Sequence, residues 1–187
     1  LMCALSPIAG PAGAQDDDPN LWLEEVDGKK ALEWVKERCA RDQAELEAVP
    51  EFAPLHKRLL EIYNDRARIP AVSFEGAWLY HYWQDAQHVR GIWRRTFLDE
   101  YLKEDTAWDV VLDLDALAAA EGENWVWNGA AFLPPAGRSC LLSLSRGGGD
   151  AVVVREYDTV AKRFVEDGFT VPEAKTRISW KDHDTVW

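Results

Sequence analysis

A chain of 187 residues with 47% hydrophobic side chains is long enough to bury a substantial core, which excludes a disordered chain. Its 33 acidic and 21 basic residues give a formal charge of -12, and no long run of Lys and Arg occurs, so nucleic acid is not expected as a partner. No segment reaches the ~18 consecutive apolar residues that cross a bilayer, so no membrane span is expected either.

The first residues are apolar or small, and Ala12-Gly13-Ala14 has the form of a signal-peptidase cleavage site. We interpret residues 1–14 as the remnant of a secretory signal peptide, which predicts a periplasmic or secreted protein. Neither a positively charged segment nor an initiating Met precedes this run, so a flexible tail is the alternative. Cys3 would be removed with the signal.

Residues 15–69 are interpreted as an acidic linker, Gln15 to Pro19, followed by an N-terminal helical segment. Asp27 can cap a helix, and a second helix is predicted after Pro50. Apolar residues recur at helical spacing in both, as Leu32, Val35, Cys39 and Leu46 and then as Phe52, Leu55, Leu59 and Ile62.

From residue 70 the apolar period changes from that of a helix to that of a strand. Aromatic residues alternate through Trp78–Trp83, which predicts a strand, and Val89, Gly91 and Trp93 are expected to form its hairpin partner. Val110, Leu112 and Leu114 alternate with aspartates and predict a further strand, with a helical turn at 117–121.

A second set of strands follows, with turn residues Arg146 to Asp150 between two of them. The predicted strands lie at Trp125 and Trp127, Cys140–Leu144, Ala151–Tyr157 and Arg163–Val165, and Arg177–Trp180 begins a third set. Phe74 and Phe132, like the turns at Asp85 and Arg146, are roughly 60 residues apart, as expected for repeated sheet units.

This pattern predicts a mainly β fold with an N-terminal α-helical segment. Residues 70–187 would form an incomplete β-propeller of about two blades plus the start of a third. Two blades cannot close a ring, so we do not expect Trp187 to be a natural domain boundary. Trp78, Trp93, Trp125 and Trp127 are expected in the core, and one or two tryptophans at most on a ligand surface.

No catalytic residue is predicted. A serine hydrolase of the α/β type needs its nucleophile in G-x-S-x-G on a strand-to-helix turn, and no serine has that context. The serines in strand-like segments are instead expected to bond locally or to face water: Ser73, Ser139, Ser143, Ser145 and Ser179.

No cofactor-binding or metal-binding residue is predicted. The glycines 147–149 lack the Lys-Ser/Thr ending of a phosphate loop and are expected to form a hairpin turn. Asp182-His183-Asp184 offers three metal ligands but is expected to be a solvated turn. His56, His81 and His88 are scattered and are expected to be structural or exposed.

Two cysteines remain beyond the signal, Cys39 on a predicted helix and Cys140 in a predicted strand. Both lie on apolar faces, so we expect free, buried thiols, with a disulfide in an oxidising compartment as the alternative. The absence of any C-x-x-C argues against a thiolate metal site.

Two stretches near the N-terminus, Asp18 to Val26 (DPNLWLEEV) and Ala31 to Arg38 (ALEWVKER), resemble the opening of the prolyl oligopeptidase family of serine peptidases. Trp78–Trp83 resembles the aromatic first blade of that family, and Trp93-Arg94-Arg95-Thr96 looks like the strand after it. Asn124–Ala130 and Asp150–Tyr157 resemble later blades, so the resemblance spans Asp18 to Trp187.

The resemblance implies a larger parent with a seven-bladed propeller and an α/β-hydrolase domain that carries a Ser-Asp-His triad. None of the triad positions lies in this chain. The family propeller caps the active site and favours short peptides. We therefore expect an N-terminal fragment of a serine-type oligopeptidase, inactive alone, that supplies scaffold and substrate gating, with peptide substrate bound through the parent's catalytic domain.

Two alternatives remain open at this point. One is a non-catalytic, exported β-propeller that binds peptides or glycans through its aromatic residues. The other is an inactive remnant whose unpaired sheet edges favour aggregation. The residues do not distinguish cleavage after proline from cleavage after basic residues, nor do they indicate an oligomeric state.

Overall fold

The computed structural model describes residues 18–135 and 137–187 of the chain. The described residues divide into two compact units, one that ends at Leu59 and one that runs from Leu60 to Trp187. The predicted signal remnant, residues 1–14, lies outside the described residues. Within the described ranges, no helix is both long enough and apolar enough to cross a membrane.

The helical segment contains the two α-helices that the apolar periodicity predicts. The first begins at Lys29, because Gly28 and not the predicted Asp27 occupies its N-cap. The Gly28 carbonyl oxygen accepts the first helical hydrogen bond, from the Leu32 amide at 2.9 Å. The elements are η1 (Leu21–Glu24), α1 (Lys29–Glu47) and α2 (Phe52–Tyr63).

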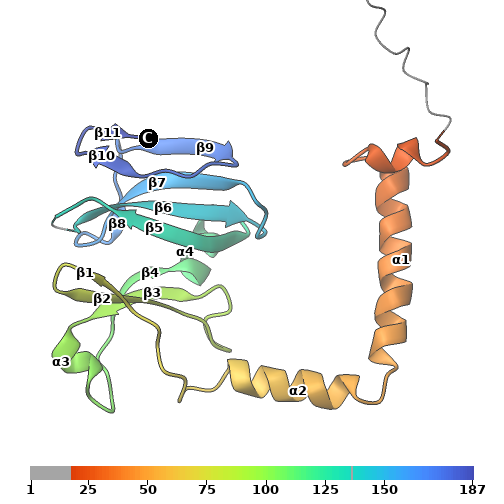
Figure 1. Cartoon of the computed structure of the whole chain (residues 1–187), viewed down its shortest axis with the longest axis horizontal. Helices are drawn as coiled ribbons and strands as arrows, with labels where there is room; N and C mark the ends of the chain where they lie inside the picture. The colour runs from red at the N-terminus through yellow and green to blue at the C-terminus, as the bar shows by residue number, and fades with distance from the viewer. Residues whose placement is uncertain (1–17, 136) are drawn as a thin grey trace, which may run out of the picture. The chain divides into compact units, whose positions relative to one another are not determined.

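The first sheet is a four-stranded antiparallel meander in which strands adjacent in sequence are adjacent in space (Figure 1). The pairing of Tyr82 with Trp93 and of His81 with Arg94 fixes the register between its two central strands. Because side chains alternate along a strand, Tyr82 and His81 lie on opposite faces. The strands are β1 (Ser73–Glu75), β2 (Trp78–Trp83), β3 (Ile92–Thr96) and β4 (Asp109–Asp113).

The loop before β3 differs from the sequence-based prediction. Alternation predicts that Val89 and Gly91 belong to the strand, yet the strand begins at Ile92. Gly91 has a φ of 99°, which is incompatible with a regular strand, and its amide hydrogen bonds to the Asp115 carboxylate at 3.2 Å. The backbone therefore turns at Gly91 before pairing starts.

The end of β4 also differs. Leu114 is predicted as the last strand residue but is the first residue of α4 (Leu114–Glu121), which extends the predicted turn at 117–121 into a helix. The Asp113 side chain accepts a hydrogen bond from the Ala116 amide at 2.9 Å and so caps this helix. A short helix, α3 (Leu98–Tyr101), lies between β3 and β4.

The second sheet has five strands and repeats the meander of the first. Its third strand pairs with the second strand on one side and with the last two strands on the other. In the pairing with the last strand, the register shifts between Val152 and Val154. The strands are β5 (Trp125–Phe132), β6 (Ser139–Arg146), β7 (Val152–Asp158), β8 (Arg163–Phe164) and β9 (Thr170–Ala174). A final hairpin joins β10 (Trp180–Asp182) to β11 (Thr185–Val186).

The main hydrophobic core lies between the two sheets, which Figure 1 shows as successive layers of one unit. Tyr80 and Trp93 of the first sheet and Leu142 and Tyr157 of the second belong to one cluster of buried residues. Trp125 is 3% exposed, and the partly buried Trp78 and Trp127 pack against the same cluster, which confirms the prediction that these tryptophans are core residues. Burial of such large side chains is the main source of stability between the sheets.

A second core lies between the opposite face of the second sheet and the terminal hairpin. Leu141, Val152 and Val154 form its buried centre, against which Trp180 and Val186 pack. The Trp180 indole Nε1 donates to the Ala131 carbonyl oxygen at 2.9 Å, which ties the hairpin to β5. The second sheet therefore packs on both of its faces.

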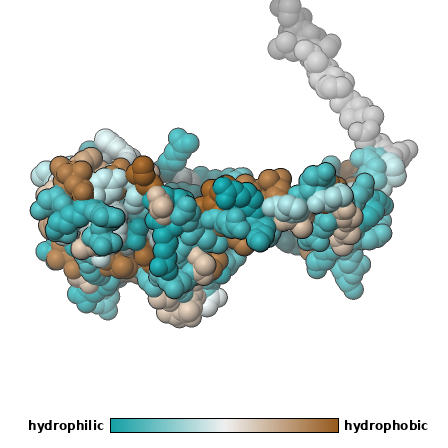
Figure 2. All heavy atoms as spheres, turned by 90° about the horizontal axis from the view of Figure 1, so that it is seen from below, coloured by the Kyte–Doolittle hydropathy of each residue, from teal (hydrophilic) through white to brown (hydrophobic). Residues whose placement is uncertain are grey.

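The expectation for the cysteines is partly wrong. Both thiols are free, and Cys140 is fully buried, but Cys39 on α1 is exposed. Apolar spacing alone places Cys39 on the same helix face as Leu32 and Val35, yet those side chains are exposed too. Figure 2 shows apolar side chains at the surface among polar ones.

The fold class is confirmed at its coarser level, as mainly β with a few helices. In the part of the chain that the structure describes, neither sheet closes on itself. The loop between β2 and β3 and the loop between β6 and β7 both join the second and third strands of their sheets, as the spacing of about 60 residues predicts.

Candidate functional site

The serines singled out in the sequence are spread over the β unit. Ser145 is 2% exposed, and within residues 18–135 and 137–187 no serine hydroxyl is hydrogen bonded to a histidine ring. A nucleophile activated by a base therefore does not form among the described residues. Ser73 lies in β1, Ser139, Ser143 and Ser145 lie in β6, and Ser179 precedes β10.

The glycines 147–149 form a tight turn between β6 and β7. Gly147 and Gly148 have φ values of 64° and 81°, and the Gly147 amide donates to the Asn124 carbonyl oxygen at 2.8 Å. A strand follows the turn, so no helix N-terminus is present to hold a phosphate group. The predicted hairpin turn is confirmed.

Asp182, His183 and Asp184 form the turn between β10 and β11. The His183 ring contacts the Asp184 carboxylate at 2.9 Å, and the Asp184 amide donates to Asp182 at 3.0 Å. Hydrogen bonding to Asp184 raises the pKa of His183, which is exposed. Among the described residues, no three His, Cys, Asp or Glu side chains converge to hold a metal ion.

The three remaining histidines have different surroundings. His56 stacks on Phe52 of α2, with ring centroids 6.2 Å apart. His88 contacts Asp85 through Nδ1 at 3.1 Å. His81 is 6% exposed and lies beside two tryptophans and an arginine, in the cluster described next.

This cluster lies on the face of the first sheet that points away from the second sheet. Arg94 projects from β3, and its guanidinium lies 4.9 Å from the centre of the Trp83 ring and 4.3 Å from that of the Trp108 ring. Its Nε donates to His81 Nδ1 at 3.2 Å. The Arg68 guanidinium also contacts the Trp83 ring, at 4.2 Å. Two cations thus share one indole.

The cluster forms the floor of an open cavity of about 750 Å³. The segment Arg66–Pro70 and the loop Tyr101–Thr106 border the cavity, and the Tyr101 hydroxyl ties the two together by donating to the Pro70 carbonyl oxygen at 2.9 Å. Both borders belong to the same unit as the sheet. The cavity is therefore built from one sheet face and two loops that flank it.

Burial, more than charge, alters the pKa values of His81 and Arg94. Burial, followed by the positive charges of Arg94 and Arg68, lowers the pKa of His81 to about 4. Burial also lowers the pKa of Arg94 to about 10. His81 is therefore neutral at pH 7 and accepts the Arg94 hydrogen bond, while Arg94 carries its charge.

Asp85 borders the same cavity and already has a full set of donors. Its carboxylate accepts hydrogen bonds from the Trp83 indole at 2.9 Å and from the amides of Gln87 and His88 at 2.8 and 2.9 Å. Burial opposes ionisation of Asp85, but these hydrogen bonds outweigh it and hold its pKa well below the usual range. Asp85 therefore organises the loop between β2 and β3.

A second cavity, of about 430 Å³, lies where β1 and the sheet face of β2 and β3 meet β5. Tyr82 and Trp127 stack across it with centroids 5.1 Å apart, and Trp93 contacts Trp127 at the same distance. Burial raises the pKa of Glu75 at its border. Five of its twelve lining residues are Phe, Tyr or Trp.

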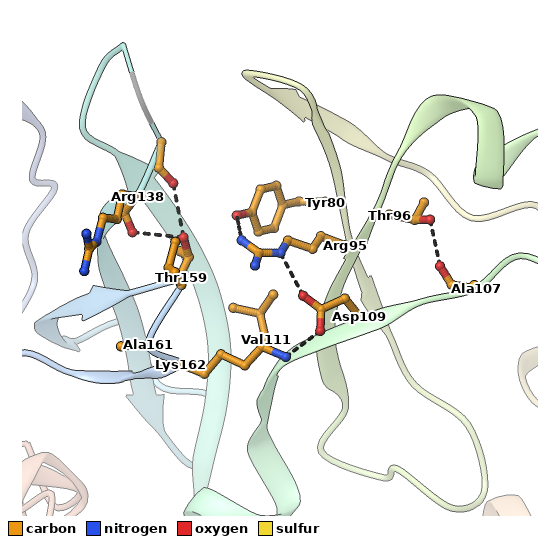
Figure 3. A network of polar contacts seen from close by, with 12 residues as sticks. Tyr80, Arg95, Thr96, Ala107, Asp109, Val111, Arg138, Thr159, Ala161 and Lys162 are labelled. Atoms are coloured by element: carbon orange, nitrogen blue, oxygen red, sulfur yellow. Dashed lines mark hydrogen bonds and ion pairs between the residues drawn. The ribbon is translucent and has the colours of Figure 1, made fainter.

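Polar contacts link the two sheets on the other side of the main core. Arg95 of β3 donates to the Tyr80 hydroxyl at 3.1 Å and to Asp109 at 3.0 Å, and Figure 3 shows its side chain between these two residues. Asp109 also accepts a hydrogen bond from Lys162, which lies after β7 in the second sheet. The Tyr157 hydroxyl donates to the Val111 carbonyl oxygen at 2.6 Å. The bonds from Lys162 and Tyr157 join the two sheets, whereas both Arg95 bonds lie within the first sheet.

The sequence reasoning does not identify Arg68, Arg94 or Trp108 as site residues. Alternation places Arg94 on the face of His81 and Trp83, which is a usable signal. Trp108 precedes β4, and Arg68 precedes β1, so only the tertiary fold brings them together. Among its lining residues, the described cavity contains no nucleophile that is hydrogen bonded to a base.

Comparison with known proteins agrees with this architecture. Residues 7–187 match the family model described as the prolyl oligopeptidase N-terminal β-propeller domain. The chain is similar to the uncharacterized peptidase y4nA of Sinorhizobium fredii, with 38% identity over 98% of this chain and 26% of that protein. An uncharacterized peptidase of Rickettsia prowazekii is 31% identical over 88% of this chain and 24% of its own length.

Solved structures show the same relation. A post-proline cleaving enzyme from Rickettsia typhi superposes with a TM-score of 0.81 and 32% identity, over 88% of this chain and 25% of that one. Oligopeptidase B from Leishmania major shares the fold, with a TM-score of 0.64 and 17% identity over 89% of this chain and 23% of its own. The chain spans about a quarter of the length of these relatives. It belongs to the prolyl oligopeptidase family and matches part of that family's N-terminal β-propeller domain.

Proposed function

We propose that this chain is the opening part of the β-propeller of a peptidase that hydrolyses short peptides, with cleavage after proline. The observation that carries the proposal is the superposition, with a TM-score of 0.81 and 32% identity, on the enzyme of Rickettsia typhi described as post-proline cleaving. The match of residues 7–187 to the propeller model of the same family supports it.

Within that propeller, the first sheet and the second sheet are proposed as two blades, and the hairpin of β10 and β11 as the start of a third. Residues 15–69 are proposed as the linker and helical segment that precede the propeller, which would begin at residue 70. Propeller blades bury their faces against neighbours, and the second sheet does so on both sides.

The catalytic groups are proposed to lie outside this chain, in a serine-type hydrolase domain of a longer protein. Two observations support this. The described residues contain no nucleophile bonded to a histidine, and the relatives reported above are about four times as long as the part that this chain matches. The role left to this chain is to support that domain and to restrict access to it.

Restricted access follows from the rigidity of the packing. A tight aromatic core between the sheets, reinforced by hydrogen bonds such as that from Tyr157 to Val111, resists opening. A wall of such sheets around an active site admits a flexible peptide and keeps out a folded protein. Exclusion of bulk water from the site would also favour the reaction.

An exported location is proposed as well, and it rests on Ala12-Gly13-Ala14, which matches a signal-peptidase site. N-terminal sequencing of the protein recovered from its host would test it. A mature N-terminus at Gln15 supports export, whereas retention of residues 1–14 in the mature protein contradicts it.

The experiment for the peptidase proposal is a hydrolysis assay on the product of the complete reading frame that contains this sequence. We expect release of the chromophore from a short peptide with proline before the scissile bond, and labelling of one serine by a fluorophosphonate. The purified 187-residue chain is the matched control and should be inactive. Peptide binding without hydrolysis by the complete product would instead favour a non-catalytic binding propeller.

A further inference from the structure

We propose that the aromatic cavity between the two sheets binds an organic ammonium ion, in which the Glu75 carboxylate pairs with the ammonium group and aromatic rings of both sheets hold its apolar stem. The ligand is a primary amine on an apolar chain, and it is a free molecule rather than a part of the longer protein. Binding by this chain does not depend on the proposed function. Access to the site in the longer protein does rest on it, because blades of a propeller surround a channel.

Both walls of this cavity belong to the described chain. One wall is formed by residues 71–75 and one face of β2 and β3, and the other wall is formed by β5. No lining residue comes from β4, β6 or β7, so the cavity lies along the edge where the first strands of the two sheets, β1 and β5, meet. In the proposed propeller, further blades would pack on the outer face of the first sheet and beyond the terminal hairpin, and this edge would face the central channel.

Glu75 lies on the face of β1 that points to the second sheet. It pairs with Trp78 of β2, which packs against the core between the sheets, and residues paired across antiparallel strands share a face. A Cβ added to Gly137 would lie 3.8 Å from both the Glu75 Cβ and the Phe132 ring. Glu75 is therefore close to the second sheet as well as part of the first.

The Glu75 carboxylate has no cation of its own. Among the described residues it forms no ion pair and no hydrogen bond, and burial raises its pKa with no nearby cation to offset this effect. The lining contains no Lys or Arg, and its one histidine, His81, is neutral at pH 7. Arg95, on the same sheet face, and Lys162 are both engaged with Asp109. A half-buried carboxylate without a partner favours a cationic ligand.

Aromatic rings form much of the remaining lining and can hold the stem of the ligand. Tyr82 and Trp127 stack with centroids 5.1 Å apart, and both side chains are half-buried, as is Phe132. Tyr82 is four residues along β2 from Trp78, the partner of Glu75, which separates the two ends of the cavity by ~13 Å. Aromatic faces attract cations as well as apolar groups. An ammonium ion on a stem of several carbons therefore matches the cavity better than a bare metal ion does.

The test is a titration of the ¹⁵N-labelled chain with 4-phenylbutylamine at pH 7, followed through the tryptophan indole signals. The neutral alcohol 4-phenylbutan-1-ol has the same stem and is the matched control ligand. We expect the Trp93 and Trp127 signals to report binding of the amine about tenfold tighter than that of the alcohol. The signal of the exposed Trp187 should not move. Equal affinities for the two ligands, or no shift with tens of millimolar amine, would overturn the proposal.

A substitution at Glu75 locates the ammonium group. Glu75→Gln should weaken binding of the amine about tenfold, because it removes the negative charge and keeps the size of the side chain, and it should leave binding of the alcohol unchanged. Glu166→Gln, at an exposed carboxylate after β8, is the matched control and should leave both affinities unchanged. Unchanged amine affinity in Glu75→Gln would refute the site.

Ser73→Lys provides a second, independent measurement. Ser73 is exposed, lines the cavity and lies two residues before Glu75 on the same face of β1, so a lysine there places an ammonium group beside the carboxylate. This internal cation should compete with the ligand and weaken amine binding about tenfold, whereas the uncharged substitution Ser73→Gln should change it little. Similar affinities in the two variants would contradict a site that recognises charge.

The same titration on the product of the complete reading frame, followed by calorimetry with any fluorophosphonate-reactive serine blocked, tests whether the site is open in the longer protein. We expect binding of the amine that Glu75→Gln weakens as it does in the chain. Binding by the chain alone would show that another part of the longer protein covers the cavity, and it would overturn the assignment to a free ligand. Hydrolysis of proline peptides is measured separately, so failure of this site and failure of the proposed function are distinguishable.

Discussion

Gly91 occupies a position that a larger residue cannot take without cost. Its φ of 99° lies in a region that L-residues avoid, and an added Cβ would lie 2.5 Å from the Tyr82 ring and hydroxyl. Gly91→Ala should therefore lower the free energy of unfolding by about 3 kcal/mol, from backbone strain and from displacement of Tyr82. Urea unfolding of the chain measures the loss.

Gly76 is the matched control at the residue scale. Its φ is 62°, but an added Cβ would meet no atom within 4 Å. Gly76→Ala should cost only about 1 kcal/mol, since the backbone term alone applies. Equal losses in the two variants would show that the contact with Tyr82 does not constrain Gly91.

His81 makes the stability of the chain depend on pH. Its pKa is lowered from 6.5 to about 4 in the folded state, by burial first and by Arg94 and Arg68 next. The unfolded chain therefore binds more protons than the folded chain between these values, so stability falls as pH drops from about 6.5 towards 4, by up to about 3 kcal/mol.

His81→Gln should remove this part of the pH dependence, because a Gln side chain can still accept the Arg94 hydrogen bond but does not titrate. Chemical unfolding at a series of pH values checks it. His56→Gln, at an exposed position of α2, is the control and should keep the slope of the unsubstituted chain. A slope that persists in His81→Gln would contradict the assignment.

At the scale of elements, one hydroxyl joins the two sheets. Tyr157 is 2% exposed, and its hydroxyl donates to the Val111 carbonyl oxygen at 2.6 Å across the main core. Tyr157→Phe leaves that buried carbonyl without this donor and should cost about 1.5 kcal/mol in unfolding free energy. Tyr63→Phe, at a side chain that is 67% exposed, should change stability little by the same measurement. Similar values for the two would argue against a bridging role.

Asp109 forms two ion pairs, one with Arg95 and one with Lys162, and the two cations differ in burial. Arg95 is 6% exposed, whereas the side chains of Lys162 and Asp109 are 39% and 37% exposed. Burial opposes ionisation of Asp109, but hydrogen bonds from Lys162 and Arg95 outweigh it and lower its pKa. The Asp109 carboxylate therefore stabilises the fold mainly by pairing with the buried Arg95 charge.

Asp109→Asn should accordingly cost about 2 kcal/mol, because it leaves the Arg95 charge buried and poorly paired. Lys162→Met should cost less than about 1 kcal/mol, because solvent screens an exposed pair. Thermal or urea unfolding of the two variants gives the comparison. A larger loss in Lys162→Met would reverse the order of importance that the burial indicates.

Sequence periodicity identifies most elements because the first strands alternate strictly. The aromatic alternation of Trp78–Trp83 gives β2 directly, and the glycines at 147–149 give the turn before β7. Periodicity does not reveal that Leu114 starts a helix, because the alternation of apolar residues up to Leu114 fits a strand equally well. The hydrogen bond from the Ala116 amide to the Asp113 side chain favours the helix. The spacing of apolar residues does not show which polar side chain caps a helix.

The cavity on the first sheet is less accessible to sequence reasoning. Strand alternation predicts that His81, Trp83 and their cross-strand partner Arg94 share one face. The other two residues at the floor of the cavity, Arg68 and Trp108, lie outside the strands. Their approach depends on how two loops fold over the sheet.

At the scale of the whole molecule, the two sheets, their shared core and the second core under the terminal hairpin form one side of a proposed cap over a peptidase active site. A cap of this kind acts by size. It should affect which substrates reach the active site more than the chemistry of those that do. The proposed function therefore predicts that substrates are selected by size. An assay with a single short peptide does not test this prediction.

The most direct measurement compares two substrates of the complete gene product that contain the same proline cleavage sequence. One is a free peptide of about ten residues, and the other is that sequence displayed on a loop of a stable folded protein. We expect efficient cleavage of the peptide and a value of kcat/KM lower by two orders of magnitude or more for the folded carrier. Equal rates for the two substrates would contradict a gating role for the propeller to which this chain belongs.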